Sequence, residues 1–144
     1  MIVLYQMAGI TDGIVVGTGN KVEDFGVKFF SKFGDGGVDI SPIGDLKKSE
    51  VRELGRYLRV SEDIINAKPT DGLWADGRCD EDQLLCSYDE LEWAMDYYEE
   101  MKSKKIIISE IESLTLREKE VLERYTELYH KGVHKVQLPP VFRL

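Results

Sequence analysis

The chain has 144 residues, of which 42% are hydrophobic and 32% charged, a composition typical of one soluble globular domain. Its formal net charge of −8 argues against nonspecific binding to nucleic acid or to an anionic membrane surface. No apolar run approaches the roughly 18 residues that cross a bilayer, so we expect a cytoplasmic protein in which Cys79 and Cys86 stay reduced.

The opening segment predicts an apolar helix that lacks a capping residue before its first turn and that Asp12-Gly13 ends. Residues 14–16 then form a short apolar run typical of a buried strand, followed by the glycine loop over residues 17–20. Helix, strand and glycine loop in this order indicate an α/β fold, in which ligands gather at the carboxyl ends of strands. In the first helix we expect four side chains to pack against another chain or a missing element: Met1, Val3, Leu4 and Met7.

Apolar residues at helical spacing predict a second helix over residues 22–33, which Gly34 would end. The glycine-rich loop over residues 34–37 follows it, and residues 38–40 resemble a strand. Three glycines around Asp35 cost conformational entropy unless the backbone needs their freedom. This loop is therefore either a ligand-binding loop or a tight turn with a solvated Asp35.

A third helix is predicted over residues 46–58, capped by Asp45. Lys48 lies in its first turn, where the helix dipole slightly disfavours a cation, so this lysine is a candidate for ligand binding as well as for the surface. The spacing of apolar residues gives the buried side of this helix. We expect that side to carry Val51, Leu54, Tyr57 and Leu58.

Ser61 is the expected cap of a short helix that ends before Pro69, and a polar, turn-rich loop over residues 70–83 follows it. Loops of this length in a small chain tend to be lids or binding segments. Capping boxes then predict two more helices, one from Ser87 with Glu90 to about Lys102, and one from Thr115 with Glu118 to about Gly132. The tail after Gly132 is predicted to be extended.

The order of these segments is more specific than any one of them. GTGNKVE, FFSKFGDGGVD, LKKSEVRELGRYL, INAKPTDGLW and DEDQ followed by SYDELEWAM resemble the NAD synthetase family over about residues 3–100, and the His134-Lys135 pair matches the family's carboxyl end. The resemblance implies the carboxy-terminal portion of an adenine-nucleotide α-hydrolase-like (ATP pyrophosphatase) α/β fold, helix-rich with a few parallel strands. It also implies one domain over residues 1–144.

The resemblance implies a ligase that amidates deamido-NAD to NAD through an adenylate formed from ATP, with ammonia as the nitrogen donor and Mg²⁺ as the metal. Glutamine delivered by another domain remains open as the source of that nitrogen. The residues that match the family's motifs would then divide into four groups. They are Thr18, Lys48 and Thr70 for ATP, Lys32, Asp35, His134 and Lys135 for deamido-NAD, Glu23 for magnesium, and Asp80 for ammonia handling.

The family's amino-terminal half carries an SGG-x-D-S motif that cradles pyrophosphate, and this sequence contains no such motif. We therefore expect the chain to need a missing amino-terminal half for the full reaction. The alternative is a noncatalytic binding or dimerisation module that keeps the deamido-NAD contacts. The resemblance further implies a homodimer, with His134 and Lys135 acting across the subunit interface.

Overall fold

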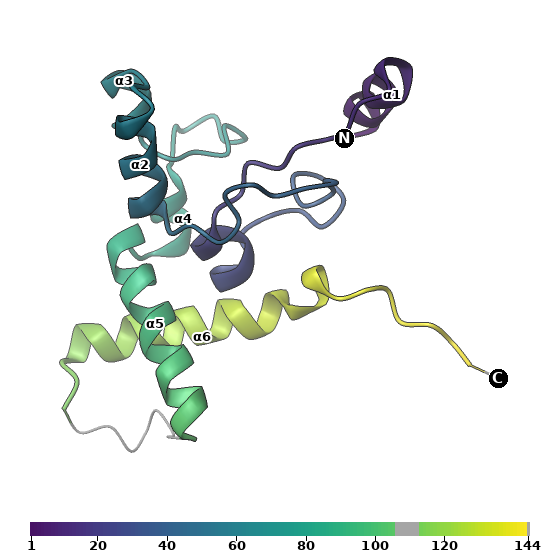
Figure 1. Cartoon of the computed structure of the whole chain (residues 1–144). Helices are drawn as coiled ribbons and strands as arrows, with labels where there is room; N and C mark the ends of the chain where they lie inside the picture. Colours follow the sequence, from purple (N-terminus) through teal and green to yellow (C-terminus); the bar gives the residue numbers. More distant parts are fainter. Residues whose placement is uncertain (106–112, 144) are drawn as a thin grey trace. The chain divides into compact units, whose positions relative to one another are not determined.

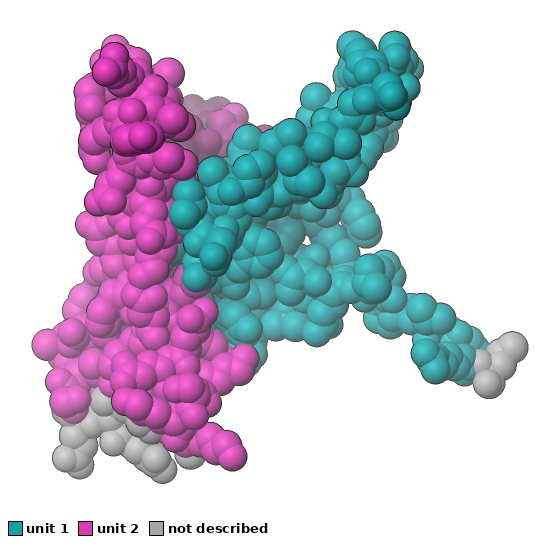
Figure 2. Space-filling model, viewed as in Figure 1, with its two compact units in different colours: residues 1–46, 125–144 teal, residues 47–124 magenta. Residues whose placement is uncertain are grey.

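The computed structural model describes residues 1–105 and 113–143, and the chain divides into two compact units (Figures 1 and 2). Unit 1 contains residues 1–46 and 125–144, and unit 2 contains residues 47–124. Within the described part, no helix is both long enough and apolar enough to cross a membrane. The helices are α1 (Ile2–Thr11), η1 (Lys21–Val27), α2 (Lys48–Tyr57), α3 (Glu62–Ile65), α4 (Asp80–Leu84), α5 (Tyr88–Lys104) and α6 (Leu116–Val136).

Neither predicted strand forms as a strand in the described residues, and the two segments are paired in parallel only through an isolated bridge between Val16 and Ile40. Gly17 N–H donates to the Ile40 carbonyl at 2.7 Å, and Asp39 N–H donates to the Val15 carbonyl at 2.9 Å. Parallel strands are normally buried on both faces within a larger sheet. Val16 is instead 51% exposed, and the described residues of unit 1 otherwise form helices joined by turns and irregular segments.

The helix predicted over residues 22–33 is much shorter, and Gly34 does not end it. Asn20 caps η1 by accepting hydrogen bonds from Val22 N–H at 3.0 Å and Glu23 N–H at 3.1 Å. The helix ends at Val27, and Lys28 caps it with a left-handed backbone of φ 55°. The Lys28 ammonium donates to the carbonyls of Phe25 at 2.9 Å and Gly26 at 3.3 Å, which stabilises this early end.

The predicted cap of α2 is also wrong. Lys47 precedes the helix, and its N–H donates to the Glu50 carboxylate at 2.7 Å. Asp45 instead forms an ion pair with Lys21 at 3.1 Å. The predicted buried side is not observed either, because Tyr57 and Leu58 are exposed and α2 has no fully buried residue.

Both capping boxes of the long helices are confirmed. Ser87 Oγ accepts from Glu90 N–H at 3.2 Å, and Ser87 N–H donates to the Glu90 carboxylate at 2.8 Å at the start of α5. Thr115 N–H donates to the Glu118 carboxylate at 2.7 Å at the start of α6. The core of unit 2 is then built by apolar side chains from α4, α5 and the beginning of α6. These are Leu84, Tyr88, Leu91, Ala94, Met95, Val121 and Leu122.

Helix α6 does not stop at Gly132 but continues to Val136, so His134 and Lys135 lie in its last turn and the extended tail begins later. Gly132 is buried against Lys28, and a Cβ at this position would lie 2.4 Å from the Lys28 Cβ. The glycine therefore permits close packing inside a helix rather than a helix end.

Gly132→Ala is expected to destabilise the chain by about 1–3 kcal/mol, because the new methyl group overlaps an atom fixed to the backbone. Urea denaturation measures this loss. Gly9→Ala is the matched control, since Gly9 also lies inside a helix but has no atom within 4 Å of an added Cβ. That variant should be neutral or stabilised by up to about 1 kcal/mol, and equal stabilisation of both variants would contradict the packing argument.

Glu90 links the starts of α5 and α6 through its carboxylate. Arg117 Nε donates to it at 2.7 Å and Arg117 Nη2 at 2.9 Å. These bonds, together with those from Ser87, lower the pKa of Glu90 from 4.5 to about 2 against a smaller opposing effect of burial. Because the pKa is lower in the folded chain, Glu90 stabilises the fold above about pH 4.5, and this stabilisation disappears as the pH falls towards 2.

Glu90→Gln is expected to cost about 1–2 kcal/mol at pH 7, a value reduced to allow for partial solvent exposure. It should also flatten the dependence of unfolding free energy on pH between about 5 and 2. Denaturant titrations across this range test both effects. Glu120 is the control, because it forms an ion pair with the same Arg117 at 3.5 Å but its side chain is 56% exposed. Glu120→Gln should change stability by less than about 0.5 kcal/mol, and a loss as large as that of Glu90→Gln would refute the assignment.

Candidate active site

The glycine loop of unit 1 borders a cavity of about 320 Å³ at the carboxyl end of the segment that carries Val16. Thr18 and Asp35 both line this cavity, although they come from different loops. An added Cβ at Gly17 would lie 2.8 Å from Val38, so glycine is needed where the two loops approach each other. Two of the predicted site residues, one for each substrate, thus share one cavity.

Acidic side chains gather beside this loop. Burial, and then the charges of Glu23 and Asp35, raise the pKa of Asp24 from 3.8 to about 6. The Asp24 carboxylate fills the space next to Gly19, where an added Cβ would lie 1.9 Å from Oδ2. Within the described residues, no three His, Cys, Asp or Glu side chains are placed to hold a metal by themselves. The assignment of Glu23 to Mg²⁺ stays a prediction, in which phosphate oxygens would supply further ligands.

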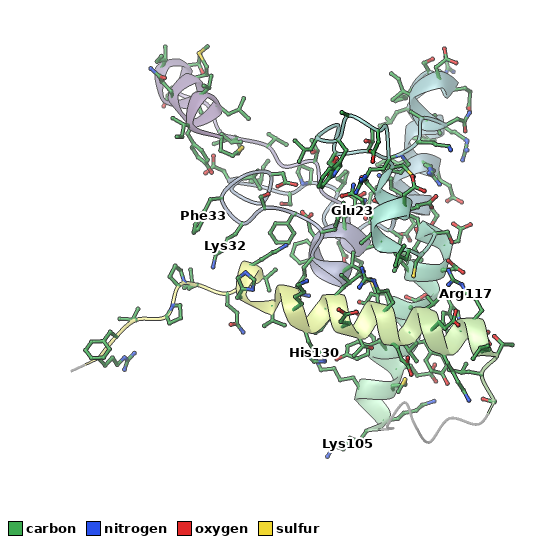
Figure 3. The ribbon with its side chains drawn as sticks, turned by 180° about the vertical axis from the view of Figure 1, so that it is seen from behind. Glu23, Lys32, Phe33, Lys105, Arg117 and His130 are labelled. Atoms are coloured by element: carbon green, nitrogen blue, oxygen red, sulfur yellow. The ribbon has the colours of Figure 1, made fainter. Side chains whose placement is uncertain are left out.

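Lys32 and His134 are brought together although 102 positions separate them in the sequence. The Lys32 ammonium donates to the His134 carbonyl at 2.9 Å and to the Gln137 carbonyl at 2.5 Å. Figure 3 shows Lys32 projecting from its loop towards the end of α6. The His134 side chain is exposed, and its Nδ1 lies 3.1 Å from the Lys131 carbonyl.

Lys135 joins the same region from α6. Its ammonium donates to the carbonyls of Lys28 at 2.8 Å and Phe30 at 2.7 Å. The lysines predicted to bind deamido-NAD therefore lie at one end of unit 1, where each also holds backbone carbonyls of its own chain. A role for His134 and Lys135 across a subunit interface stays a prediction.

Unit 2 brings Lys48 and Asp80 to opposite parts of one tyrosine, Tyr88. The Lys48 ammonium lies 4.9 Å from the centre of the Tyr88 ring, within the range of a cation–π interaction. The Tyr88 hydroxyl donates to Asp80 Oδ2 at 3.2 Å. Asp80 and Tyr88 are both buried, with 7% and 1% of their surfaces exposed.

The predicted loop over residues 70–83 is shortened by α4, which begins at Asp80. Thr70 Oγ1 contacts the Arg78 carbonyl at 3.4 Å and accepts from Gly72 N–H at 3.1 Å. Asp80 N–H donates to the Pro69 carbonyl at 3.0 Å, which closes the base of the loop. Thr70 and Asp80 thus lie at the same end of this segment, whereas Trp74, 50% exposed, packs its ring on Arg78.

The sequence motifs do not single out Asp24 or Tyr88. Asp24 is overlooked because its neighbour Glu23 matches the family motif and its own burial is not visible in the sequence. Tyr88 directly follows the Ser87 cap, where an aromatic residue in the first helical turn could have been suspected of facing inward. Neither residue stands out without the contacts made by distant segments.

Comparison with protein families matches the NAD synthase family to residues 1–139. Among curated proteins, the NH3-dependent NAD(+) synthetase of Sulfolobus acidocaldarius is 39% identical over 145 residues, and the match covers 100% of this chain and 50% of that protein. The synthetase of Archaeoglobus fulgidus with the same description is 39% identical over 144 residues, covering 100% of this chain and 52% of its own length. The chain thus spans about half the length of these relatives.

Two solved structures resemble the chain. The NMN synthetase of Francisella tularensis superposes with a TM-score of 0.76 at 32% identity, and the match covers 99% of this chain and 52% of that one. The NH3-dependent NAD synthetase of Campylobacter jejuni gives a TM-score of 0.68 at 19% identity, covering 99% and 51%, and supports the fold alone. By the extent of the family match, the chain belongs to the NAD synthase family.

Proposed function

We propose that the chain is the carboxy-terminal part of an NAD synthetase, a ligase that amidates deamido-NAD with ammonia at the expense of ATP. The observation that carries the proposal is the contact between Lys32 and the His134 carbonyl at 2.9 Å. Two residues assigned to the same dinucleotide, and distant in sequence, meet at one end of unit 1. Family membership and the cavity shared by Thr18 and Asp35 support the same function.

The chemistry requires two steps. The nicotinate carboxylate attacks the α-phosphorus of ATP, and pyrophosphate leaves. Ammonia then attacks the carboxyl carbon, AMP leaves, and the nitrogen loses one proton. Lys48 would hold ATP phosphates as a point charge, Thr18 and Thr70 would contact ATP, and the Asp80 carboxylate would orient ammonia and receive the proton.

Lys32, Asp35, His134 and Lys135 would hold deamido-NAD. Bound Mg²⁺ supplies Lewis-acid stabilisation of phosphoryl transfer, and Glu23 is its candidate ligand on this chain. The role of this chain's own groups is to bind and orient both substrates, since cations and hydroxyls fixed by packing need no rearrangement as charge develops.

We also propose that an amino-terminal half covers α1 in the active protein. Helix α1 has no buried residue, and the exposed fractions of Ile2, Val3, Leu4, Met7 and Ile10 lie between 51% and 87%. A helix of 10 residues is marginal in water without packing, and contiguous apolar surface marks an interface. The relatives are about twice as long as the matched chain, so a half of suitable size exists in the family.

The test is reconstitution. The chain is assayed alone and with the amino-terminal half of the Archaeoglobus fulgidus synthetase, given ATP, Mg²⁺, ammonium and deamido-NAD. We expect equimolar NAD and AMP in the presence of that half. Nicotinate mononucleotide is supplied in a parallel assay, because one similar structure is described as an NMN synthetase. The proposed function would be refuted if neither deamido-NAD nor nicotinate mononucleotide gave product in the presence of the added half, and if calorimetry showed no binding of ATP or deamido-NAD.

The second candidate is a noncatalytic binding or dimerisation module. Such a module would keep the deamido-NAD contacts, with Lys32 and Lys135 at one end of unit 1, and would carry out no chemistry. Deamido-NAD binding by the chain alone, with no product formed even when the amino-terminal half is bound, would support this module over the ligase.

A further inference from the structure

Lys48, Asp80 and Tyr88 share a position in unit 2: each is the first residue of its helix, α2, α4 and α5 respectively. One backbone N–H at the start of α2 and one at the start of α5 are already satisfied by carboxylates of the chain. Ser49 N–H donates to Glu92 at 2.8 Å, and Tyr88 N–H donates to Glu81 at 2.8 Å. The side chains, and not free helix ends, are therefore what this cluster offers to a ligand.

The aromatic ring of Tyr88 explains why a lysine is tolerated at the start of α2. A cation there opposes the helix dipole, and the ring face at 4.9 Å from the Lys48 ammonium compensates by a cation–π attraction. Ser49 Oγ also donates to Glu92 of α5 at 2.6 Å, so the first turn of α2 is fixed to the helix that carries Tyr88. The direction of Lys48 is thus set by α5.

The hydroxyl of Tyr88 makes a separate contact, a hydrogen bond to Asp80. Its bond to Oδ2 at 3.2 Å joins two buried side chains, so solvent does not replace it easily. Glu81, the neighbour of Asp80, accepts from the backbone of the same tyrosine. The position of the Asp80 carboxylate is consequently tied to the rigid start of a 17-residue helix.

From these contacts we infer that Tyr88 is a positioning residue for the amidation reaction, holding Lys48 through its ring and Asp80 through its hydroxyl. The inference rests on the proposed function, in which Lys48 serves ATP and Asp80 serves ammonia. In this role Tyr88 acts through Lys48 and Asp80. The ring and the hydroxyl of Tyr88 act on two different steps of the reaction, so variants that remove the hydroxyl alone or the ring as well can test the role.

The experiment compares Tyr88→Phe and Tyr88→Leu with the unmutated chain in the reconstituted assay described above. Tyr88→Phe keeps the ring and removes the hydroxyl. We expect kcat to fall by about 10- to 100-fold and the KM for ammonium to rise, with the KM for ATP unchanged within about twofold. Tyr88→Leu removes the ring as well, so its KM for ATP should also rise, by about tenfold. Phenylalanine therefore rescues ATP binding but not the ammonia-dependent step.

Tyr125→Phe is the matched control, because Tyr125 is also 1% exposed and lies outside the cluster. It should keep the kinetic constants of the unmutated chain, and melting temperatures of all variants separate folding losses from kinetic ones. Equal kinetic constants for Tyr88→Phe and Tyr125→Phe in an active enzyme would overturn the inference and leave the proposed function intact. An unmutated chain that makes no product in either assay would remove the proposed function, and the inference would fall with it.

Discussion

Lys48→Met is expected to lower the rate of NAD formation in the reconstituted enzyme by about 100- to 1,000-fold, the range found when one preorganised charge-stabilising group is removed. Methionine keeps the length and the apolar stem of lysine but removes its charge. The loss should appear in kcat/KM for ATP, measured by release of AMP. The fold should persist, because the Lys48 side chain packs on the Tyr88 ring through contacts that methionine can also make with an aromatic face.

Lys47→Met is the control for this change. Lys47 adjoins Lys48 and carries the same charge, but its ammonium forms an ion pair with Asp96, which is 59% exposed. Surface ion pairs contribute little, so this variant should retain activity within about threefold. If both variants lose activity equally, the general positive charge at the start of α2 matters, and the specific role assigned to Lys48 is wrong.

Charging one face of α1 should prevent association with the amino-terminal half. The double variant Leu4→Asp, Met7→Asp places two carboxylates where apolar side chains are 53% and 51% exposed. Truncating a central apolar contact costs about 2–4 kcal/mol, and desolvating a charge there costs more. We therefore expect binding of that half to weaken by at least about 100-fold in calorimetry. The thermal stability of the chain alone should not fall, because α1 buries no residue.

Gly9→Asp is the control for the added charge. Residue 9 lies two positions from Met7 and five from Leu4 on a helix of about 3.6 residues per turn, so its side chain occupies the face opposite these two residues. This variant should bind the amino-terminal half with an affinity within about threefold of the unmutated chain. A second copy of the chain is the competing partner. Sedimentation would favour that partner if the unmutated chain were a dimer and the double variant a monomer without any added half.

The sequence alone identified the family, because membership depends on the order of short motifs and needs no coordinates. It also placed the beginnings of α5 and α6 correctly. Both rest on hydrogen bonds between residues three positions apart, Ser87 with Glu90 and Thr115 with Glu118. Such bonds are formed within one turn of backbone, so local chemistry is sufficient to predict them.

Local patterns failed where a distant segment decides the backbone. The apolar spacing after Val22 predicted a helix to residue 33, yet η1 ends at Val27 and is capped by Lys28. Lys28 packs on Gly132 and places its ammonium 3.6 Å from the centre of the Tyr129 ring. The same contact explains why Gly132, expected to end α6, lies inside it. Hydrophobic periodicity contains no information on a partner more than 100 positions away.

For the candidate site, the sequence determined which residue types are present and in what order, from Thr18 through Asp80 to His134. Only the tertiary structure decided that Lys32 reaches the His134 carbonyl, that Thr18 and Asp35 share a cavity, and that Tyr88 joins Lys48 to Asp80. The reason is physical. Motif spacing follows the covalent chain, whereas these contacts arise from packing between segments that the chain keeps far apart.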